Sequence, residues 1–311
     1  MLWGKVFVYF LHQPLKEICK IILEDVEDKN PKDNSGNTPL HEAAKNGHDD
    51  IFQLILDADD ETWDLNIKDQ FGKTPIHYAV KNGHKNICNI ILPIVSNKNP
   101  QDNLLTTPLH EAAESGHVEI FNIIIQEVEE INPKDQFGKT PLHYSAMNGQ
   151  KEIFKIILED VEDKNPQDNL GMTPLNEAFE NGHEEICKLI LDENPKDSKG
   201  RTPLHDVVIK GYGPFEMILD YVEDKSPKDE NGMTPLHLAA QYGRASFIQQ
   251  LLNKVKDKNP RDKDGATPFY LAVKNNQKEI CQIILNHNED VGNILGELVA
   301  HTGQKRSYNG L

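Results

Sequence analysis

The sequence predicts an all-α fold, a solenoid of stacked helix-turn-helix units that are joined by β-hairpin-like loops. Two observations support this prediction: a recurring tetrapeptide and a recurring turn in front of it. Self-similarity at a period of about 20–50 residues is typical of repeat architectures, in which each unit packs on its neighbours. The tetrapeptide T-P-L-H or a close variant starts at eight threonines, at steps of 36, 33, 33, 33, 29, 32 and 33 residues: Thr38, Thr74, Thr107, Thr140, Thr173, Thr202, Thr234 and Thr267.

A turn precedes each tetrapeptide. A glycine stands two residues before seven of the eight threonines, and Leu105 is the exception. Aspartate, asparagine and glycine favour tight turns, because Asp and Asn side chains bond to the backbone and Gly accepts unusual backbone angles. We therefore expect a hairpin-like loop in every repeat. Each loop begins at an aspartate five residues before the threonine: Asp33, Asp69, Asp102, Asp135, Asp168, Asp197, Asp229 and Asp262.

The first helix of a repeat begins at the tetrapeptide. Thr38 can cap the helix through its hydroxyl, and Pro39 fits the first turn, where its missing N–H is not needed. Ala43 and Ala44 lie on a narrow apolar stripe that lets helices approach closely. Gly47 can then end the helix in a left-handed conformation.

The second helix follows directly and is more apolar. Ile51, Phe52 and Ile55 recur on one face of it, and the sequence Asn-Pro-Lys-Asp ends it. One helix pair cannot bury this face alone, whereas stacking against neighbouring pairs does so.

These motifs resemble the ankyrin repeat family. The resemblance covers about residues 30–290, with eight in-phase copies of T-P-L-H followed by the A-A and N-G-H motifs. It implies that the tetrapeptide histidine hydrogen-bonds locally, and that hairpin tips and first helices line a concave binding face. The expected repeats are 33–68, 69–101, 102–134, 135–167, 168–196, 197–228, 229–261 and 262–290.

Both flanks fit the same scheme. Residues 15–26 are in phase with the second helices, so residues 1–32 are expected to form a degenerate N-terminal repeat or cap. Residues 291–311 are expected to form a C-terminal capping helix and a tail. The helical spacing there involves Val291, Ile294, Leu295, Leu298 and Val299.

Composition excludes several classes of function. The chain has 33 Lys+Arg against 50 Asp+Glu and a net charge of −17, which would repel the phosphates of a nucleic acid. No apolar run approaches the ~18 residues of a membrane span. There is no N-glycosylation sequon, and no cleavage site follows the short apolar N-terminal run. We expect an intracellular, cytoplasmic protein.

Cysteines and histidines are predicted to be structural. The cysteines share a slot that holds phenylalanine in other repeats, as core residues do. His41-Glu42 and His110-Glu111 start like a zinc-protease motif, but the second histidine is absent in both. We therefore expect no metal, no cofactor and no catalytic site. The four cysteines are Cys19, Cys88, Cys187 and Cys281.

The candidate partner-binding surface is a set of apolar hairpin tips and first-helix residues. Four successive tips carry Phe or Leu, whereas the other tips are polar. Apolar and aromatic groups of this kind favour a partner site. Two alternatives stay open, a relic of duplication and tips that bury one another. The candidate residues are Phe71, Tyr78, Leu104, Phe137, Tyr144, Met147, Leu170 and Met172.

Two further expectations concern stability and charge. Residues 170–215 depart most from the consensus, with Asn176 in place of His and Phe179 in place of Ala, so we expect this span to open first. Acidic runs recur where second helices end, as a solvated edge or as a site for a basic partner. The runs lie at 24–28, 57–61, 127–130, 159–163 and 220–224.

The predicted function is a non-catalytic interaction protein: a monomeric scaffold, adaptor or regulatory subunit that binds other proteins. The alternative is an ankyrin-repeat fragment of a larger effector or enzyme, of the kinase, channel or ubiquitin-ligase adaptor type. The sequence does not name the partner.

Overall fold

The fold comes from a computed structural model, which describes residues 14–58 and 64–287 and the helical residues 292, 294, 296 and 299. The named elements in these ranges are seventeen α-helices, α2 to α18. They alternate between the first and second helices of the repeats, which confirms the predicted all-α solenoid fold.

The first helices begin at the proline of each tetrapeptide, as predicted. The preceding threonine is extended, with φ −112° at Thr38, and Gly47 ends the first of these helices at φ 71°. They are α3 (Pro39–Asn46), α5 (Pro75–Lys81), α7 (Pro108–Ser115), α9 (Pro141–Met147), α11 (Pro174–Glu180), α13 (Pro203–Lys210), α15 (Pro235–Tyr242) and α17 (Pro268–Lys274).

Each first helix is followed by a turn and then by a second helix. The second helices of the first six positions are α2 (Pro14–Asp25), α4 (Asp49–Asp57), α6 (Lys85–Ile91), α8 (Val118–Ile125), α10 (Lys151–Asp160) and α12 (Glu184–Glu193). The last three are α14 (Phe215–Tyr221), α16 (Ala245–Lys254) and α18 (Lys278–Asn286). Five of them, α2, α4, α8, α10 and α14, end at or next to the acidic runs noted in the sequence.

The chain divides into two compact units. The first holds residues 1–162 and 166–186, and the second holds 163–165 and 187–311. The division passes through α12, between Ile186 and Cys187, inside the span that the sequence predicts to open first.

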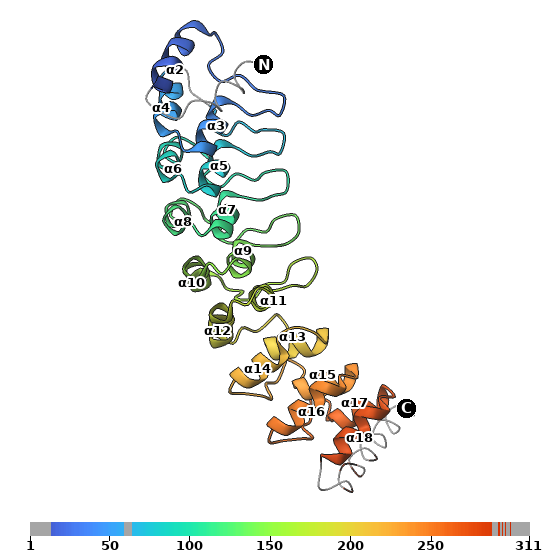
Figure 1. The fold of residues 1–311 in the computed structure, drawn as a ribbon. Helices are drawn as coiled ribbons and strands as arrows, with labels where there is room; N and C mark the ends of the chain where they lie inside the picture. The colour runs from blue at the N-terminus through green and yellow to red at the C-terminus, as the bar shows by residue number, and fades with distance from the viewer. Residues whose placement is uncertain are drawn as a thin grey trace. The chain divides into compact units, whose positions relative to one another are not determined.

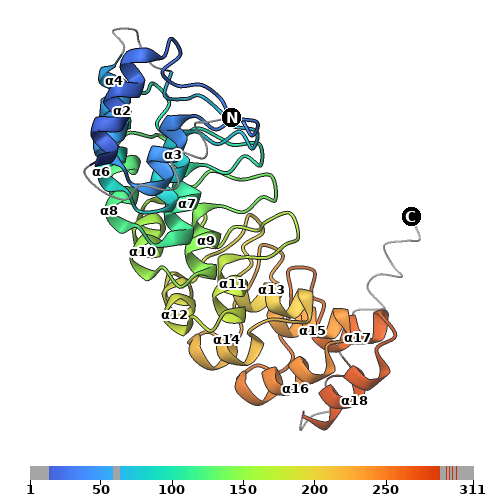
Figure 2. The same ribbon diagram turned by 45° about the horizontal axis from the view of Figure 1, so that its top comes forward.

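The first unit is built as two rows of helices. Each first helix packs on the next, from α3 to α11, and each second helix packs on the next, from α2 to α10. Figures 1 and 2 show the hairpins of this unit projecting in succession from the row of first helices, away from the second helices. Side chains on successive hairpins therefore lie on one side of the unit.

The core fills the space between the two rows. Phe52, Phe121 and Phe154 are fully buried in the second helices, and the alanines of the first helices are buried against them. The slot shared by Cys and Phe is therefore core at Cys88, and burial raises the pKa of this thiol to about 12. In the second unit, Phe215 of α14 stacks on Phe247 of α16, with ring centroids 4.0 Å apart.

The flanks are described only in part. Helix α2 packs on α4 in the row of second helices, while residues 1–13 lie outside the described residues. At the other end Ile294 is helical and buried. Val299 is helical but exposed, because five residues turn it about 140° away from Ile294. Val291, Leu295 and Leu298 lie outside the described residues.

Candidate partner-binding surface

The tetrapeptide histidines join each repeat to the next one. The Nδ1 of His77 accepts a hydrogen bond from the backbone N–H of Thr74 at 3.1 Å and lies 3.0 Å from its hydroxyl. Its Nε2 lies 3.2 Å from the carbonyl oxygen of Thr106 in the next repeat. Since Nδ1 accepts and a carbonyl cannot donate, the ring is neutral with its proton on Nε2. The same pattern holds for His41, His110, His143, His205 and His237.

This arrangement confirms the predicted local role of these histidines and adds a link that the sequence did not reveal. The threonine cap is completed through the imidazole ring, and the ring then reaches the neighbouring hairpin. Burial lowers the pKa of His77 and of His143 to about 4. These rings are therefore uncharged structural groups at neutral pH.

A second set of histidines follows the glycine turns and reaches back to the previous repeat. The Nε2 of His84 lies 3.2 Å from the carbonyl oxygen of Lys45, at the end of α3. His117 and His183 make the same contact with Lys81 and Met147. Within the described ranges no group of three or more His, Cys, Asp and Glu side chains is arranged to hold a metal ion.

The hairpins are held rigidly at their tips. In the second repeat, Oδ1 of Asp69 accepts hydrogen bonds from the N–H groups of Phe71 at 2.8 Å and Lys73 at 2.9 Å. Neighbouring hairpins then pair through their backbones: the N–H of Asn103 donates to the carbonyl of Phe71 at 2.9 Å, and that of Gln136 to the carbonyl of Leu104 at 3.0 Å.

Five apolar side chains stand on these rigid tips, and we call them the apolar ridge. The exposed fractions are 57% for Phe71, 46% for Leu104, 41% for Leu105, 52% for Phe137 and 84% for Leu170. Phe71, Phe137 and Leu170 have half or more of their surface exposed to solvent, and Leu104 and Leu105 somewhat less than half. Leu105, which stands where other repeats have glycine, was not among the predicted site residues.

The two tyrosines of the predicted site lie beneath the hairpins and are half-buried. The hydroxyl of Tyr78 donates to Oδ2 of Asp69 at 2.6 Å, and that of Tyr144 to Oδ2 of Asp135 at 2.8 Å. Burial, followed by these carboxylates, raises the pKa of both phenols. Both side chains therefore position the hairpins and offer a partner only part of their surface.

The remaining predicted residues, Met147 and Met172, are also half-buried. Met172 follows the last tip of the ridge, and its carbonyl oxygen accepts the contact from the Nε2 of His143. The structure thus places four predicted residues on the ridge itself and four at its base.

The first-helix position that follows the tetrapeptide holds tyrosine and glutamate in alternate repeats of the first unit, and the glutamates Glu111 and Glu177 are buried. Glu111 forms ion pairs with Lys73 and with Lys81, the second at 3.0 Å. Glu177 pairs with Lys139 at 2.6 Å. Burial alone would raise the pKa of Glu111, but the two ammonium groups outweigh it and hold the pKa below its ordinary value.

The surface of the first unit repeats every two repeats. Phe71 and Phe137 are 66 residues apart in the sequence, and so are Tyr78 and Tyr144, Lys73 and Lys139, and Glu111 and Glu177. Even an exposed pair follows this period: Lys85–Glu119 and Lys151–Glu185 both measure 2.8 Å. The ridge therefore alternates Phe tips and Leu tips over a base that alternates Tyr and Glu.

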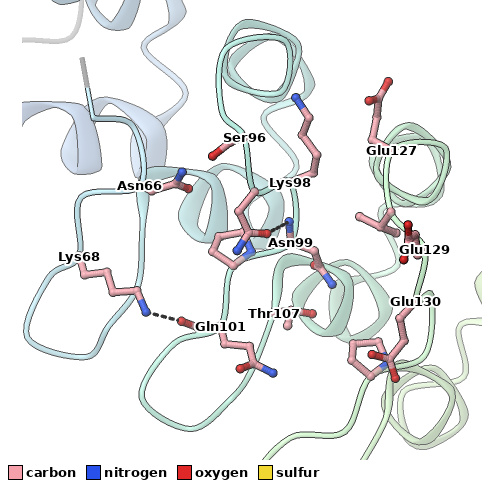
Figure 3. A pocket seen from close by; sticks show the side chains of 14 residues that line it. Asn66, Lys68, Ser96, Lys98, Asn99, Gln101, Thr107, Glu127, Glu129 and Glu130 are labelled. Atoms are coloured by element: carbon pink, nitrogen blue, oxygen red, sulfur yellow. Dashed lines mark hydrogen bonds between the residues drawn. The ribbon is translucent and has the colours of Figure 1, made fainter. Parts of the chain in front are cut away.

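A polar hollow of about 640 Å³ lies beside the hairpins, where second helices lead into them. Figure 3 shows Lys68 on one side of it and Glu127, Glu129 and Glu130 on the other. The ammonium of Lys68 donates to the carbonyl oxygen of Gln101 at 2.7 Å. The three glutamates are exposed and belong to one of the predicted acidic runs.

Comparison with known proteins gives one family. The family described as "Ankyrin repeats (3 copies)" matches residues 7–102, 61–135, 92–168, 120–199, 162–223 and 204–294. No curated protein matches the chain. In the part of the chain that the structure describes, no helix has the length and apolar content needed to cross a membrane.

Proposed function

Because this chain belongs to the ankyrin repeat family, whose repeats generally mediate protein–protein interaction, we propose that it binds a partner protein through the apolar ridge. It acts without catalysis, as a monomeric scaffold, adaptor or regulatory subunit. The carrying observation is the exposure of Phe71, Leu104, Phe137 and Leu170 on successive hairpins.

The geometry supports binding in two ways. Contiguous exposed apolar side chains favour association, because a partner removes them from water. The tips are also fixed by backbone hydrogen bonds such as that from Asn169 to Phe137 at 2.9 Å, so little conformational freedom is lost on binding.

Buried thiols agree with the proposed cytoplasmic location. Cys19, Cys88 and Cys187 are buried in the described core. The histidine contacts and ion pairs of the surface are accounted for by packing between repeats, which supports the non-catalytic assignment. In a longer protein, the same surface would direct an attached effector or enzyme to its target.

The first prediction tests the ridge directly. The double substitution Phe71→Ser and Phe137→Ser removes two exposed rings without touching the core, so the helical circular dichroism and thermal midpoint should stay close to those of the parent. Affinity capture with mass spectrometry should recover partners with the parent chain and lose them, by about tenfold or more, with the variant. Asn231→Ser, at the equivalent tip of repeat seven, is the matched control.

The same capture distinguishes a second mode of binding. Glu127, Glu129 and Glu130 are exposed beside the hollow and would attract a partner with a basic surface. Partners held by this acidic run would elute with moderate salt, whereas partners on the ridge would resist it. Capture that is unchanged in the Phe71/Phe137 variant would contradict the ridge as the binding surface.

A further inference from the structure

We propose that the apolar ridge holds a short extended segment of the partner, with an apolar side chain at every third residue and acidic side chains beside the two phenylalanine tips. This inference rests on the proposed function and specifies the chemistry of the partner. It assigns Leu105, Lys68 and Lys134 to the binding surface as well.

The spacing of the ridge matches an extended chain. Each hairpin contributes two arms, and neighbouring hairpins are joined by backbone hydrogen bonds such as that from Asn103 to Phe71. Two strand spacings of about 4.8 Å place successive tips about 10 Å apart. Three residues of an extended chain rise by about 10 Å as well. One apolar side chain in three would therefore meet one tip after another.

The area of the ridge favours a segment over a second copy of this chain. The exposed parts of its five side chains amount to about 560 Å², if a whole side chain is taken as roughly 200 Å². A stable interface between folded proteins buries roughly 800 Å² on each partner. The ridge alone falls short of this value, whereas a single extended strand has the width of one row of tips.

The charges beside the ridge indicate acidic residues in that segment. Lys68 and Lys134 are exposed and stand on the hairpin arm three residues before Phe71 and Phe137. Neither forms an ion pair with a carboxylate of the described residues, whereas Lys73 and Lys139, on the opposite arms, are already paired with buried glutamates. The Leu tips have Gln at the corresponding position, at Gln101 and Gln167.

The acidic residues near the ridge do not cancel these two cations. The hairpin aspartates Asp69 and Asp135 are buried and accept backbone and tyrosine hydrogen bonds. The exposed glutamates lie across the hollow from Lys68 (Figure 3). These carboxylates therefore do not neutralise Lys68 beside the Phe71 tip.

Leu105 provides an independent indication that the centre of the ridge is functional. Its φ of 60° lies in the left-handed region, where the equivalent residues Gly72 and Gly138 have φ 77° and 76°. A leucine in this conformation is strained, and 41% of its surface stays exposed to solvent. A partner that covers Leu104 and Leu105 together would account for both the strain and the exposure.

A set of three fluorescein-labelled twelve-residue peptides tests the inference by fluorescence anisotropy. The first has Leu at every third position and Glu and Ser between. The second has the same composition, with its four Leu at alternate positions within one part of the peptide, and the third has Lys in place of Glu. The full chain should bind the first peptide about tenfold more tightly than either of the others, since each comparison removes one kind of contact.

Variants of the chain locate the binding. Leu105→Gly should weaken binding of the first peptide severalfold while raising the thermal midpoint by about 2 °C, because glycine relieves the strained backbone. Lys68→Gln with Lys134→Gln should weaken it about tenfold at low salt. Lys228→Gln, in the same slot of repeat seven, should leave it unchanged.

Two results would overturn the inference: equal binding of the glutamate and lysine peptides, or equal binding of the peptides with Leu at every third and at alternate positions. If the Leu105→Gly variant binds the first peptide as tightly as the parent chain does, Leu105 is not part of the binding surface. The proposed function would survive these failures if Phe71→Ser with Phe137→Ser still abolished capture of cellular partners, so the two ideas fail separately.

Discussion

At the scale of single residues, the buried carboxylates stand out. Glu111 is almost fully buried, yet it stays charged because Lys73 from the preceding hairpin and Lys81 from α5 both reach it. A buried charge is tolerated only with such partners, and removing one partner is more damaging than removing the pair. This cluster therefore fixes the hairpin of one repeat to the first helix of the next.

Glu111→Ala should be strongly destabilising, because it removes the buried carboxylate that Lys73 and Lys81 share. Among the described carboxylates, Lys73 then keeps only Asp102, at 3.9 Å, and Lys81 keeps only Glu114, at 3.4 Å. We expect a loss of about 3 kcal/mol in the free energy of unfolding. The exposed pair of Lys85 and Glu119 gives the control: Glu119→Ala should cost far less stability than Glu111→Ala, because solvent screens an exposed pair. Urea denaturation followed by circular dichroism measures both, and equal losses would mean that burial does not set the strength of these pairs.

Single residues also show where the sequence is informative. The exposure of Phe71 and Leu170 was predictable, because turn chemistry places both at hairpin tips. The pairing of Glu111 with Lys73 was not, because those residues are 38 apart and meet only once the stacking register is known. Leu105 was noticed as a missing glycine, but its strained conformation needed the backbone angles of the folded hairpin.

At the scale of elements, each histidine ring joins a first helix to the following hairpin. The structure keeps these rings neutral through burial, which lowers the pKa of His77 and His143 from 6.5 to about 4. The unfolded chain therefore binds protons more readily than the folded chain between these two values. Stability is complete above pH 6.5 and is lost as the pH falls toward 4.

Each of these two rings should cost about 2 kcal/mol of stability when the pH is lowered from 7 to 5. Urea midpoints at the two pH values measure the loss. His77→Asn with His143→Asn should lower stability at pH 7 but flatten its dependence on pH. Repeat five shows that the change can be accommodated, since Oδ1 of its Asn176 accepts from the backbone N–H of Thr173 at 3.2 Å. An unchanged slope would show that other groups govern the acid response.

Element boundaries were the most predictable part of the fold. Proline after threonine begins each first helix, because proline fixes its backbone angle, and a glycine follows seven of the eight first helices, because glycine accepts the left-handed conformation there. Asn276 takes that conformation after α17. The contact from His77 to Thr106 was beyond the sequence, since a carbonyl oxygen leaves no signature in side-chain identity. Local chemistry thus predicted the bounds of the helices, whereas the hydrogen bonds between repeats depend on how the repeats pack.

At the scale of the whole chain, the division into two units coincides with the departures from the repeat consensus. Phe179 is exposed where Ala113 and Ala146 are buried in other repeats, and the division passes through α12 shortly after it. In a repeat protein each interface between neighbours contributes separately to stability. A weak interface can therefore open while the rest stays folded.

Hydrogen exchange should show the earliest opening between residues about 170 and 215. Amides of α11 and α13 should exchange faster than those of α7 and α9, which keep the consensus residues. Asn176→His with Phe179→Ala restores that consensus and should slow exchange in this span. Uniform protection across the four helices would exclude a weak interface there.

The period of two repeats has a consequence for how such a chain can change in length. Removing or adding a single repeat would bring a Phe tip beside another Phe tip and would set Tyr above Tyr at the base, so that a lysine like Lys73 would lose its glutamate. Removing 66 residues would keep the alternation of Phe with Leu at the tips and of Tyr with Glu at the base. The length of this part of the chain can therefore change with its surface pattern intact only by two repeats at a time.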